Sequence, residues 1–274
     1  MRKFLPLILC WICFATFGQS FRVMTYNIRF DNPADGVNQW GSRKQKVFDL
    51  IRKYDPDISG VQEALVHQLK DITGNARGYT YVGVGRDDGM EKGEFSAIVY
   101  KKDKFDVLDQ GTFWLSEEPE VPGSKSWDAA ITRVATWARF NDKATGRKFF
   151  VINTHFDHIG KDARARSAEI LKQKISELAT EIPSIVTGDL NCTREEEPYQ
   201  ILTNGELVEL IDPASDPQGT FCSFEVNSIE CRPIDYIMIT NDWRADQYQV
   251  ISDHDGKYYP SDHLPVMITL SYMD

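Results

Sequence analysis

The chain has 274 residues, which is enough for one large α/β domain with a substantial core. It contains no linker-like stretch, low-complexity tract or repeat, which argues against a division into several domains. Its 31 basic and 41 acidic side chains give a net charge of −10. Such a surface is poor for nucleic acid, because polyanion binding draws its affinity from neutralised phosphates.

The N-terminal residues have the pattern of a secretory signal peptide. A short basic start, Met1-Arg2-Lys3, precedes an apolar block at 4–17 and the small residues Gly18 and Ser20. A membrane-spanning helix needs about 20 apolar residues, and no stretch of the chain is long enough. We therefore predict that residues 1–19 are a cleaved signal peptide and that the protein is exported without stable membrane insertion. Residues 20–274 are then expected to form one domain.

Apolar periodicity in the remaining chain predicts alternating strands and helices. In chain order, we expect a strand at 21–28, a helix at 44–54, a strand at 57–61, a helix at 64–72, strands at 79–85, 95–101, 105–115, 134–140 and 148–155, a helix at 163–180, a strand at 184–188, a short helix at 198–203, and strands at 233–240 and 264–271. Several strands follow one another directly and are expected to be antiparallel. The mixture predicts two β-sheets packed face to face with helices outside.

Two polar motifs lie at the ends of apolar stretches. The run at 186–191 ends on Asp189 and Asn191, and Ser261-Asp262-His263 precedes the last apolar stretch. Oxygen-bearing side chains at a strand end, and a carboxylate beside an imidazole, suit a hard divalent cation and a proton-transfer group. Each motif alone is a weak signal, because Asp and Asn are also common in the turns that follow strands.

Four further motifs occur in order along the chain: Thr25-Tyr26-Asn27, Gln62-Glu63, Asn153-Thr154-His155 and Ile234-Asp235-Tyr236. The ordered set resembles the endonuclease/exonuclease/phosphatase superfamily, which includes deoxyribonuclease I, abasic-site endonucleases, sphingomyelinases and inositol-polyphosphate phosphatases. The resemblance runs from about Phe21 to the C-terminus. It implies a four-layered α/β/β/α sandwich of two packed mixed sheets, with catalytic groups on loops at one edge. It also implies hydrolysis of a phosphate mono- or diester that depends on Mg²⁺ or Mn²⁺, with Ca²⁺ as a further option.

The resemblance implies three residues at the metal. Glu63 matches the Glu of the family's Gln-Glu pair, Asn27 matches an Asn that supports the same ion, and Asp262 matches a carboxylate near it. The sequence alone also allows simpler interpretations of all three. Glu63 would then be a favourable charge at a helix N-terminus, Asn27 a turn residue, and Asp262 a loop residue that caps backbone amides.

The resemblance also implies the catalytic groups. Asp235 is expected to accept a hydrogen bond from His263 and so to fix the tautomer of the imidazole. Asp189 and Asn191 are expected to hold the attacking water or a second cation, and Asp189 and His263 are rival candidates for the general base. His155 is expected to contact a nonbridging phosphate oxygen or the leaving group.

Four more residues are candidates on weaker grounds. Glu94 has a spacing similar to that of the Glu which supports the corresponding His in deoxyribonuclease I, and this implies a contact with His155. Arg133 lies where that nuclease has a phosphate-contacting Arg, and an exposed charge at a strand end is the alternative. Asp157 and His158 are either substrate contacts or polar loop residues.

The tryptophans and cysteines of the loops leave alternatives open. The segments 29–40 and 114–128 contain Trp40, Trp114 and Trp127, which are either exposed stacking surfaces for a sugar or base, or buried loop anchors. The first segment resembles an uncharacterised branch of exported bacterial members of the superfamily. Cys222 and Cys231 either pair across a short loop, as an oxidising compartment allows, or stay reduced.

Together these features predict an exported metal-dependent phosphoesterase that acts as a monomer. Because the chain is acidic, a small or sugar-linked phosphate ester is favoured over nucleic acid as the substrate. The alternatives are a secreted nuclease, a sphingomyelinase-like phospholipid phosphodiesterase, and a noncatalytic binder that has kept the fold.

Overall fold

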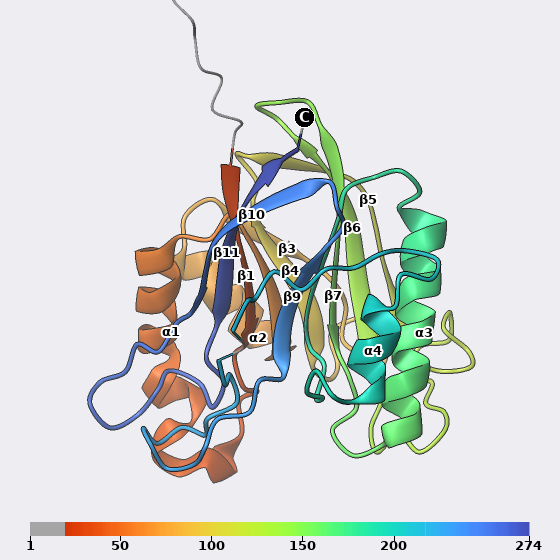
Figure 1. Ribbon diagram of the computed structural model, residues 1–274. Coiled ribbons are helices and arrows are strands. Elements are labelled where there is room, and N and C mark those ends of the chain that lie inside the picture. Colours follow the sequence, from red (N-terminus) through yellow and green to blue (C-terminus); the bar gives the residue numbers. More distant parts are fainter. Residues whose placement is uncertain (1–19, 217, 274) are drawn as a thin grey trace, which may run out of the picture.

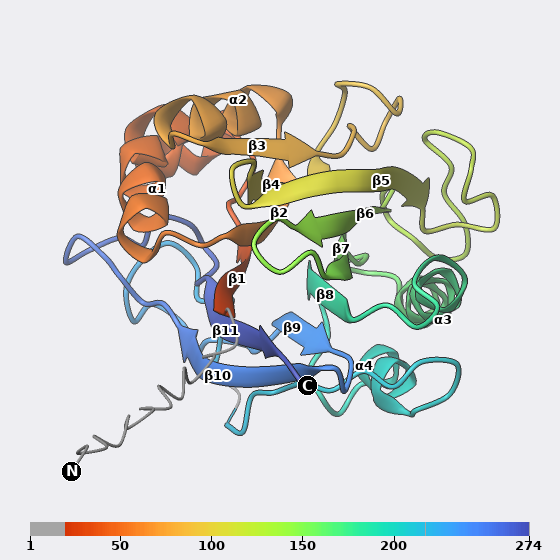
Figure 2. The ribbon, with the colours of Figure 1, turned by 90° about the horizontal axis from the view of Figure 1, so that it is seen from above.

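Two β-sheets pack face to face, and helices cover the outer face of each (Figures 1 and 2). The computed structural model describes residues 20–216 and 218–273, so the predicted signal peptide at 1–19 lies outside the described residues. Helices α1 (Trp40–Tyr54) and α2 (Val66–Asn75) cover one sheet, and α3 (Lys161–Leu178) and α4 (Glu197–Thr203) cover the other. The predicted α/β/β/α sandwich is confirmed.

The first sheet joins the N-terminal and C-terminal parts of the chain. Its strands are β1 (Ser20–Asn27), β2 (Ile58–Ala64), β3 (Tyr79–Val82), β4 (Phe95–Lys101), β10 (Trp243–Val250) and β11 (Val266–Tyr272), in the order β10-β11-β1-β2-β4-β3. Strands β1 and β2 are parallel, and the other neighbours are antiparallel. A short 3₁₀ helix, η1 (Pro33–Asn38), connects β1 to α1.

The second sheet comes from the middle of the chain. It contains β5 (Phe105–Trp114), β6 (Val134–Asp142), β7 (Lys148–His155), β8 (Ser184–Asp189) and β9 (Asp235–Ile239), paired in that order. Strands β7 and β8 are parallel because α3 crosses between them, and the other pairs are antiparallel. Both sheets are therefore mixed, as predicted.

Apolar side chains fill the space between the sheets. Phe21 of β1 packs on Phe149 of β7 and on Trp243 of β10, with ring centroids 5.2 and 5.5 Å apart. Each such side chain contributes about 1.5–3 kcal/mol when fully buried. Separate apolar clusters attach α1 and α2 to the first sheet and α3 and α4 to the second.

The interface between the sheets becomes polar near one edge. Asn153 of β7 donates to the carbonyl oxygens of Val61 and Ala97 in the opposite sheet, and its Oδ1 accepts from Gln62 Nε2 at 2.6 Å. Gly60 leaves room for this contact, since a Cβ there would collide with Thr187 Oγ1. The network joins the sheets directly beside the Gln-Glu and Asn-Thr-His motifs.

The described elements follow the predicted ones closely, but β10 and η1 were not predicted and α1 starts earlier than expected. The edge strand β10 was not expected, because its sequence is mostly polar and its side chains are largely exposed. Helix α1 starts at Trp40, four residues before the predicted start, and its first turn has no side-chain cap that would mark it in the sequence. In the described ranges, no helix has the length and apolar character needed to cross a bilayer.

Candidate active site

Strand register gathers the motif residues at one edge of the sandwich. In the first sheet, Asn27 pairs with Gln62 across parallel strands, which places Asn27 beside Glu63. In the second sheet, three residues at strand ends are consecutive partners: His155 with Asp189, and Asp189 with Asp235. The loop before β11 brings His263 to the same edge, where its Nε2 lies 3.7 Å from Asp189 Oδ2.

Irregular backbone conformations orient the side chains of Glu63 and Asn191 at this edge. The register between β2 and β4 shifts around Glu63, and Glu63 itself has a left-handed φ of 61°. Such an irregularity redirects a side chain at the end of a strand. Asn191, at φ 49°, turns the chain after β8. A left-handed backbone costs a residue such as Glu about 1–3 kcal/mol and is concentrated at functional sites.

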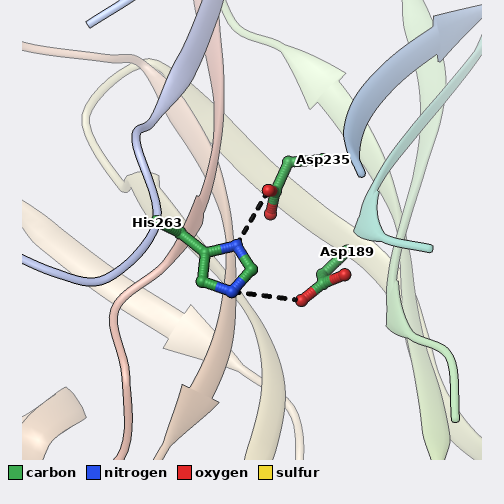
Figure 3. A group of neighbouring side chains, drawn as sticks. All are labelled: Asp189, Asp235 and His263. Carbon is green, nitrogen blue, oxygen red and sulfur yellow. Dashed lines mark hydrogen bonds and ion pairs between the residues drawn. The ribbon is translucent and has the colours of Figure 1, made fainter. Parts of the chain in front are cut away.

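Asp189, Asp235 and His263 form a buried group (Figure 3). The Nδ1 atom of His263 lies 2.8 Å from Asp235 Oδ2, and its Nε2 atom faces Asp189. The ligand atoms of the three residues lie within 4.8 Å of one another. The arrangement matches the predicted Asp235–His263 contact and adds Asp189 on the opposite side of the imidazole.

Burial and charge shift the proton affinities of this group. Burial alone would lower the pKa of His263, but the carboxylates of Asp235 and Asp189 outweigh it and raise that pKa to about 10. Burial, reinforced by the charge of Asp235, raises the pKa of the Asp189 carboxyl to about 7. The imidazole is thus held in its charged form between two carboxyl groups.

Glu63, Asp262 and Asn27 form a second, oxygen-rich group. Asn27 Nδ2 lies 3.0 Å from both Glu63 Oε1 and Asp189 Oδ2. The Arg29 guanidinium lies 3.8 Å from Glu63 Oε2 and 3.9 Å from Asp262 Oδ2. Burial disfavours the charge of Glu63, but His263 and the hydrogen bond from Asn27 outweigh it and lower the pKa of that carboxyl. Burial raises the pKa of Asp262.

The donor chemistry of this second group fits a hard divalent cation. Two carboxylates and an amide lie together in a buried site, and cationic or amide N–H groups face their oxygens. Mg²⁺ and Mn²⁺ prefer oxygen ligands of this kind. By contrast, both ring nitrogens of His263 already face carboxylates. The group of Asp189, Asp235 and His263 is therefore better suited to hydrogen bonding than to metal binding.

His155 lies on the other side of Asp189. Its Nε2 atom is 3.0 Å from Asn191 Nδ2 and 3.3 Å from Asp189 Oδ2. Asn191 also donates to the Phe156 carbonyl. The contacts with His155 and Phe156 together fix the orientation of its amide group. Burial, together with the charge of Arg133, holds the pKa of His155 well below its usual range. The imidazole is therefore neutral, and its Nδ1 atom has no hydrogen-bond partner among the described residues.

Arg133 supplies a buried positive charge. Its side chain is 5% exposed, and its Nε and Nη1 atoms have no hydrogen-bond partner among the described residues. Nη2 lies 3.3 Å from His158 Nδ1, and Asp157 Oδ2 is 4.0 Å from Nε. A buried guanidinium with free N–H groups is suited to an incoming anion such as a phosphate.

Members of both groups and Arg133 line one cavity of about 320 Å³, whereas Asn27 and Asp235 lie behind its wall. Apolar side chains of Phe30, Ile131, Phe221 and Ile234 contribute to its walls. Its polar lining consists of Arg29, Glu63, Glu94, Arg133, His155, His158, Asp189, Asn191, Arg232, Asp262 and His263. Most of the residues predicted from the sequence therefore face the same space.

Two predicted residues have other partners in the structure. Glu94 forms a two-pronged ion pair with Arg86, at 2.6 and 2.8 Å, and no hydrogen bond joins it to His155 in the described part of the chain. Asp157 does not line the cavity. Its carboxylate accepts four backbone N–H groups, those of Ala130, Ile131, Ile159 and Gly160. Asp157 thus shapes the loops beside the cavity, which agrees with the second of its two interpretations from the sequence, a polar loop residue.

The three tryptophans of the two loops differ in burial. Trp40 and Trp114 are buried, and their indole N–H groups donate to Asp71 and to the Arg86 carbonyl. They are loop anchors. Trp127 is half-buried and does not line the cavity.

Sequence reasoning missed several residues of the cavity wall. Arg29 directly follows the Thr-Tyr-Asn-Ile segment, and its position there was the available signal. Phe221, whose ring centroid lies 4.9 Å from that of His263, and Arg232 belong to a segment without a motif. These two residues pair through backbone hydrogen bonds directly beside a Cys222–Cys231 disulfide. The disulfide, one of the two alternatives for these cysteines, closes the loop that carries this wall.

Several known proteins are similar to this chain in sequence or in fold. A mannosyl-6-phosphatase from Bacteroides thetaiotaomicron VPI-5482 is 39% identical, covers 92% of this chain and all of its own, and superposes with a TM-score of 0.85. Protein angel of Drosophila melanogaster is 28% identical over 69% of this chain. The Ccr4 3′-5′-exoribonuclease subunit of the CCR4-Not complex of Mycosarcoma maydis is 24% identical over 69% of this chain. The chain spans 57% and 36% of the lengths of these last two proteins.

A family model accounts for nearly all of the sandwich. The endonuclease/exonuclease/phosphatase family matches residues 24–263, which include all six motifs of the sequence analysis. The members of this family are hydrolases that act on phosphate ester bonds. The chain belongs to the endonuclease/exonuclease/phosphatase family.

Proposed function

We propose that the protein is an exported phosphatase that uses Mg²⁺ or Mn²⁺ to hydrolyse a small phosphate ester, with a phosphorylated sugar as its substrate. The observation that carries the proposal is the cavity of about 320 Å³ that contains the buried guanidinium of Arg133. Ligand sites for small molecules start at about 300 Å³. One phosphate and a sugar ring suit this space better than a polymer.

Charge supports the same choice of substrate. The chain carries a net charge of −10, whereas the cavity wall contains Arg29, Arg133 and Arg232. The same wall also carries the carboxyl groups of Glu63, Glu94, Asp189 and Asp262, so the arginines and a bound cation together would supply the positive charge for one phosphate. The acidic surface outside the cavity opposes a long polyanion. The 39% identity to a mannosyl-6-phosphatase favours a hexose phosphate.

The family is generally dependent on a divalent metal ion, and Glu63, Asp262 and Asn27 would hold that ion here. When bound, the ion supplies positive charge to the phosphoryl oxygens. Arg133 and neutral His155, which line the same cavity, contact phosphoryl oxygens of the substrate. The carboxyl group of Asp189 and the amide of Asn191 orient the attacking water.

Proton transfer from that water involves Asp189 and His263. They face each other at 3.7 Å, and Asp235 holds the far side of the imidazole at 2.8 Å. Because His263 already carries its second proton, the proton that leaves the water passes to Asp189, whose pKa is raised to about 7, and the charged imidazole fixed by Asp235 stays beside it.

A substrate panel tests the proposal. Residues 20–274 would be assayed with Mg²⁺, Mn²⁺ or Ca²⁺ against hexose phosphates, glycerol phosphate, a nucleotide, single-stranded RNA and DNA, and sphingomyelin vesicles. We expect release of inorganic phosphate from a hexose phosphate with kcat/KM at least about tenfold above the other substrates, and loss of activity with EDTA. Preferential cleavage of RNA, DNA or lipid would overturn the choice of substrate.

Export is part of the proposal. It rests on the basic and apolar pattern of residues 1–19, and the Cys222–Cys231 disulfide is consistent with an oxidising compartment. Mass spectrometry of the protein produced by its own host tests this. A mature N-terminus near Ser20 in the exported fraction is expected, and an intact Met1 in the cytosolic fraction would contradict it.

A further inference from the structure

Arg43 is the largest of the fully buried side chains in the described residues, at 1% exposure. It lies in the first turn of α1, outside the cavity. Its guanidinium donates to five backbone carbonyl oxygens: Ile28 at 2.6 Å, Arg29 at 2.5 Å, Phe30 at 3.5 Å, Asn38 at 2.8 Å and Pro260 at 3.2 Å. The charge is thus solvated by two segments that are more than 200 residues apart in the chain.

The guanidinium has no carboxylate within 4 Å among the described residues. The rings of Trp40 and Phe224 lie 5.1 and 5.5 Å from its central carbon, and Asp262 acts on it only from a distance. Because a buried arginine without a close counterion is costly, its role must lie in the backbone that it organises.

That backbone carries the oxygen-rich group of the site. Asn27 directly precedes the three carbonyls at 28–30, and the Phe30 N–H group donates to Glu63 Oε2 at 3.2 Å. Pro260 lies two residues before Asp262, and the intervening Ser261 donates to the Asn27 carbonyl at 2.8 Å. One side chain therefore ties together the segments that place Asn27, Glu63 and Asp262.

We propose that Arg43 is a positioning residue for the divalent-metal site, since its guanidinium fixes the two segments from which Asn27 and Asp262 project. The inference rests on the metal site of the proposed function. A planar guanidinium with five N–H donors can satisfy this set of carbonyls. A lysine ammonium has three donors and cannot reach all five oxygens. Outer partners that orient metal ligands typically change metal affinity by about 10–100-fold.

Calorimetric titration with Mg²⁺ and Mn²⁺, without substrate, tests the proposal on Arg43→Met and Arg43→Lys. We expect the Kd for the metal to rise by about 10–100-fold in Arg43→Met and by less in Arg43→Lys. Excess metal should recover much of the lost kcat. The control is Lys172→Met, since Lys172 is also a buried cation that donates to a backbone carbonyl, that of Ile201, between α3 and α4. It should lower Tm and leave the Kd for the metal unchanged.

Unchanged metal affinity in folded Arg43 variants, or an equal loss of metal affinity in Lys172→Met, would overturn the inference about Arg43 and leave the proposed metal site standing. If unaltered protein binds neither Mg²⁺ nor Mn²⁺, the proposed metal site fails and the inference with it. Should both Arg43 variants fail to fold, hydrogen exchange of the unaltered protein decides. Metal binding must then slow exchange at 28–38 and at 258–262 together, and protection of one segment without the other contradicts the coupling.

Discussion

Asp235 Oδ2 lies 2.8 Å from His263 Nδ1, and both side chains are buried at the edge of the second sheet. Asp235 is itself held in place, because its backbone N–H group donates to Thr220 Oγ1 at 3.1 Å. Its second carboxylate oxygen, Oδ1, has no hydrogen-bond partner among the described residues. The pair is therefore oriented by the fold before any substrate binds.

If Asp235 acts only through His263, the two residues should behave as one unit. We expect His263→Ala to lower kcat by about 10²–10⁴, and Asp235→Asn to lower it by removing the carboxylate that orients the imidazole and keeps it charged, with little change in metal affinity. The double variant should be scarcely worse than His263→Ala, because losses within a unit are not additive. Values of kcat/KM for the three variants that multiply instead would show that Asp235 acts independently.

Glu63→Gln should weaken Mg²⁺ and Mn²⁺ binding severely. The amide keeps the shape of the side chain and removes the charge that a hard cation prefers. Calorimetric titration measures the effect, and Glu177→Gln on the exposed face of α3 is the matched control. Wild-type affinity in Glu63→Gln would remove Glu63 from the metal site.

Arg133→Met should fold and should bind phosphate more weakly than the wild type. Loss of a buried guanidinium with two free N–H groups should raise the inhibition constant of inorganic phosphate by roughly tenfold or more, which corresponds to about 1.4 kcal/mol. Arg133→Lys should recover part of the affinity. The control is Arg139→Met, because Arg139 is a partly exposed arginine on strand β6, which begins directly after Arg133. Equal inhibition constants in both Met variants would exclude Arg133 as a phosphate ligand.

The sequence was informative where local pattern and tertiary environment agree. Strands β4 and β7 have the predicted bounds, because each is built around a short run of buried apolar residues. The fold class followed from the order of such elements. Strand β10 was missed because an edge strand needs no apolar face on its exposed side, so that its sequence resembles a loop.

The residues of the site also fall into those that the sequence predicted and those that it did not. The ordered motifs pointed to Asn27, Glu63, His155, Asp189 and His263, and strand register brings these residues together. The partners that depend on loop conformation were not predictable. Asp157 faces backbone amides of a neighbouring loop, Glu94 faces Arg86, and Arg43 faces five carbonyls. Contacts of this kind follow from the path of the backbone and leave no spacing in the sequence.

The last prediction concerns stability at the end of the sandwich remote from the cavity. Asp57 is 2% exposed, and its carboxylate accepts from Lys101 Nζ and Lys104 Nζ, both at 2.8 Å, and from the Arg22 N–H group at 2.9 Å. Burial disfavours the charge of Asp57, but these hydrogen bonds outweigh it and lower the pKa of the carboxyl. Asp57→Asn should therefore destabilise the protein at pH 7 by roughly 1–3 kcal/mol, because Lys101 loses its buried carboxylate partner and keeps only the half-exposed Asp55.

The sign of the pH dependence follows from the lowered pKa of Asp57. A carboxyl with a lower pKa in the folded state than in the unfolded state stabilises the fold fully above the unfolded value of 3.8, and loses that contribution as the pH falls through the folded value. Urea denaturation should hence show a constant difference between wild type and Asp57→Asn from neutral pH down to about pH 5, and a shrinking difference below pH 3.8. Asp103→Asn, at an exposed position of the nearby turn, should show no such dependence. A difference that grows in acid would mean that Asp57 is not held as the charged partner of Lys101 and Lys104.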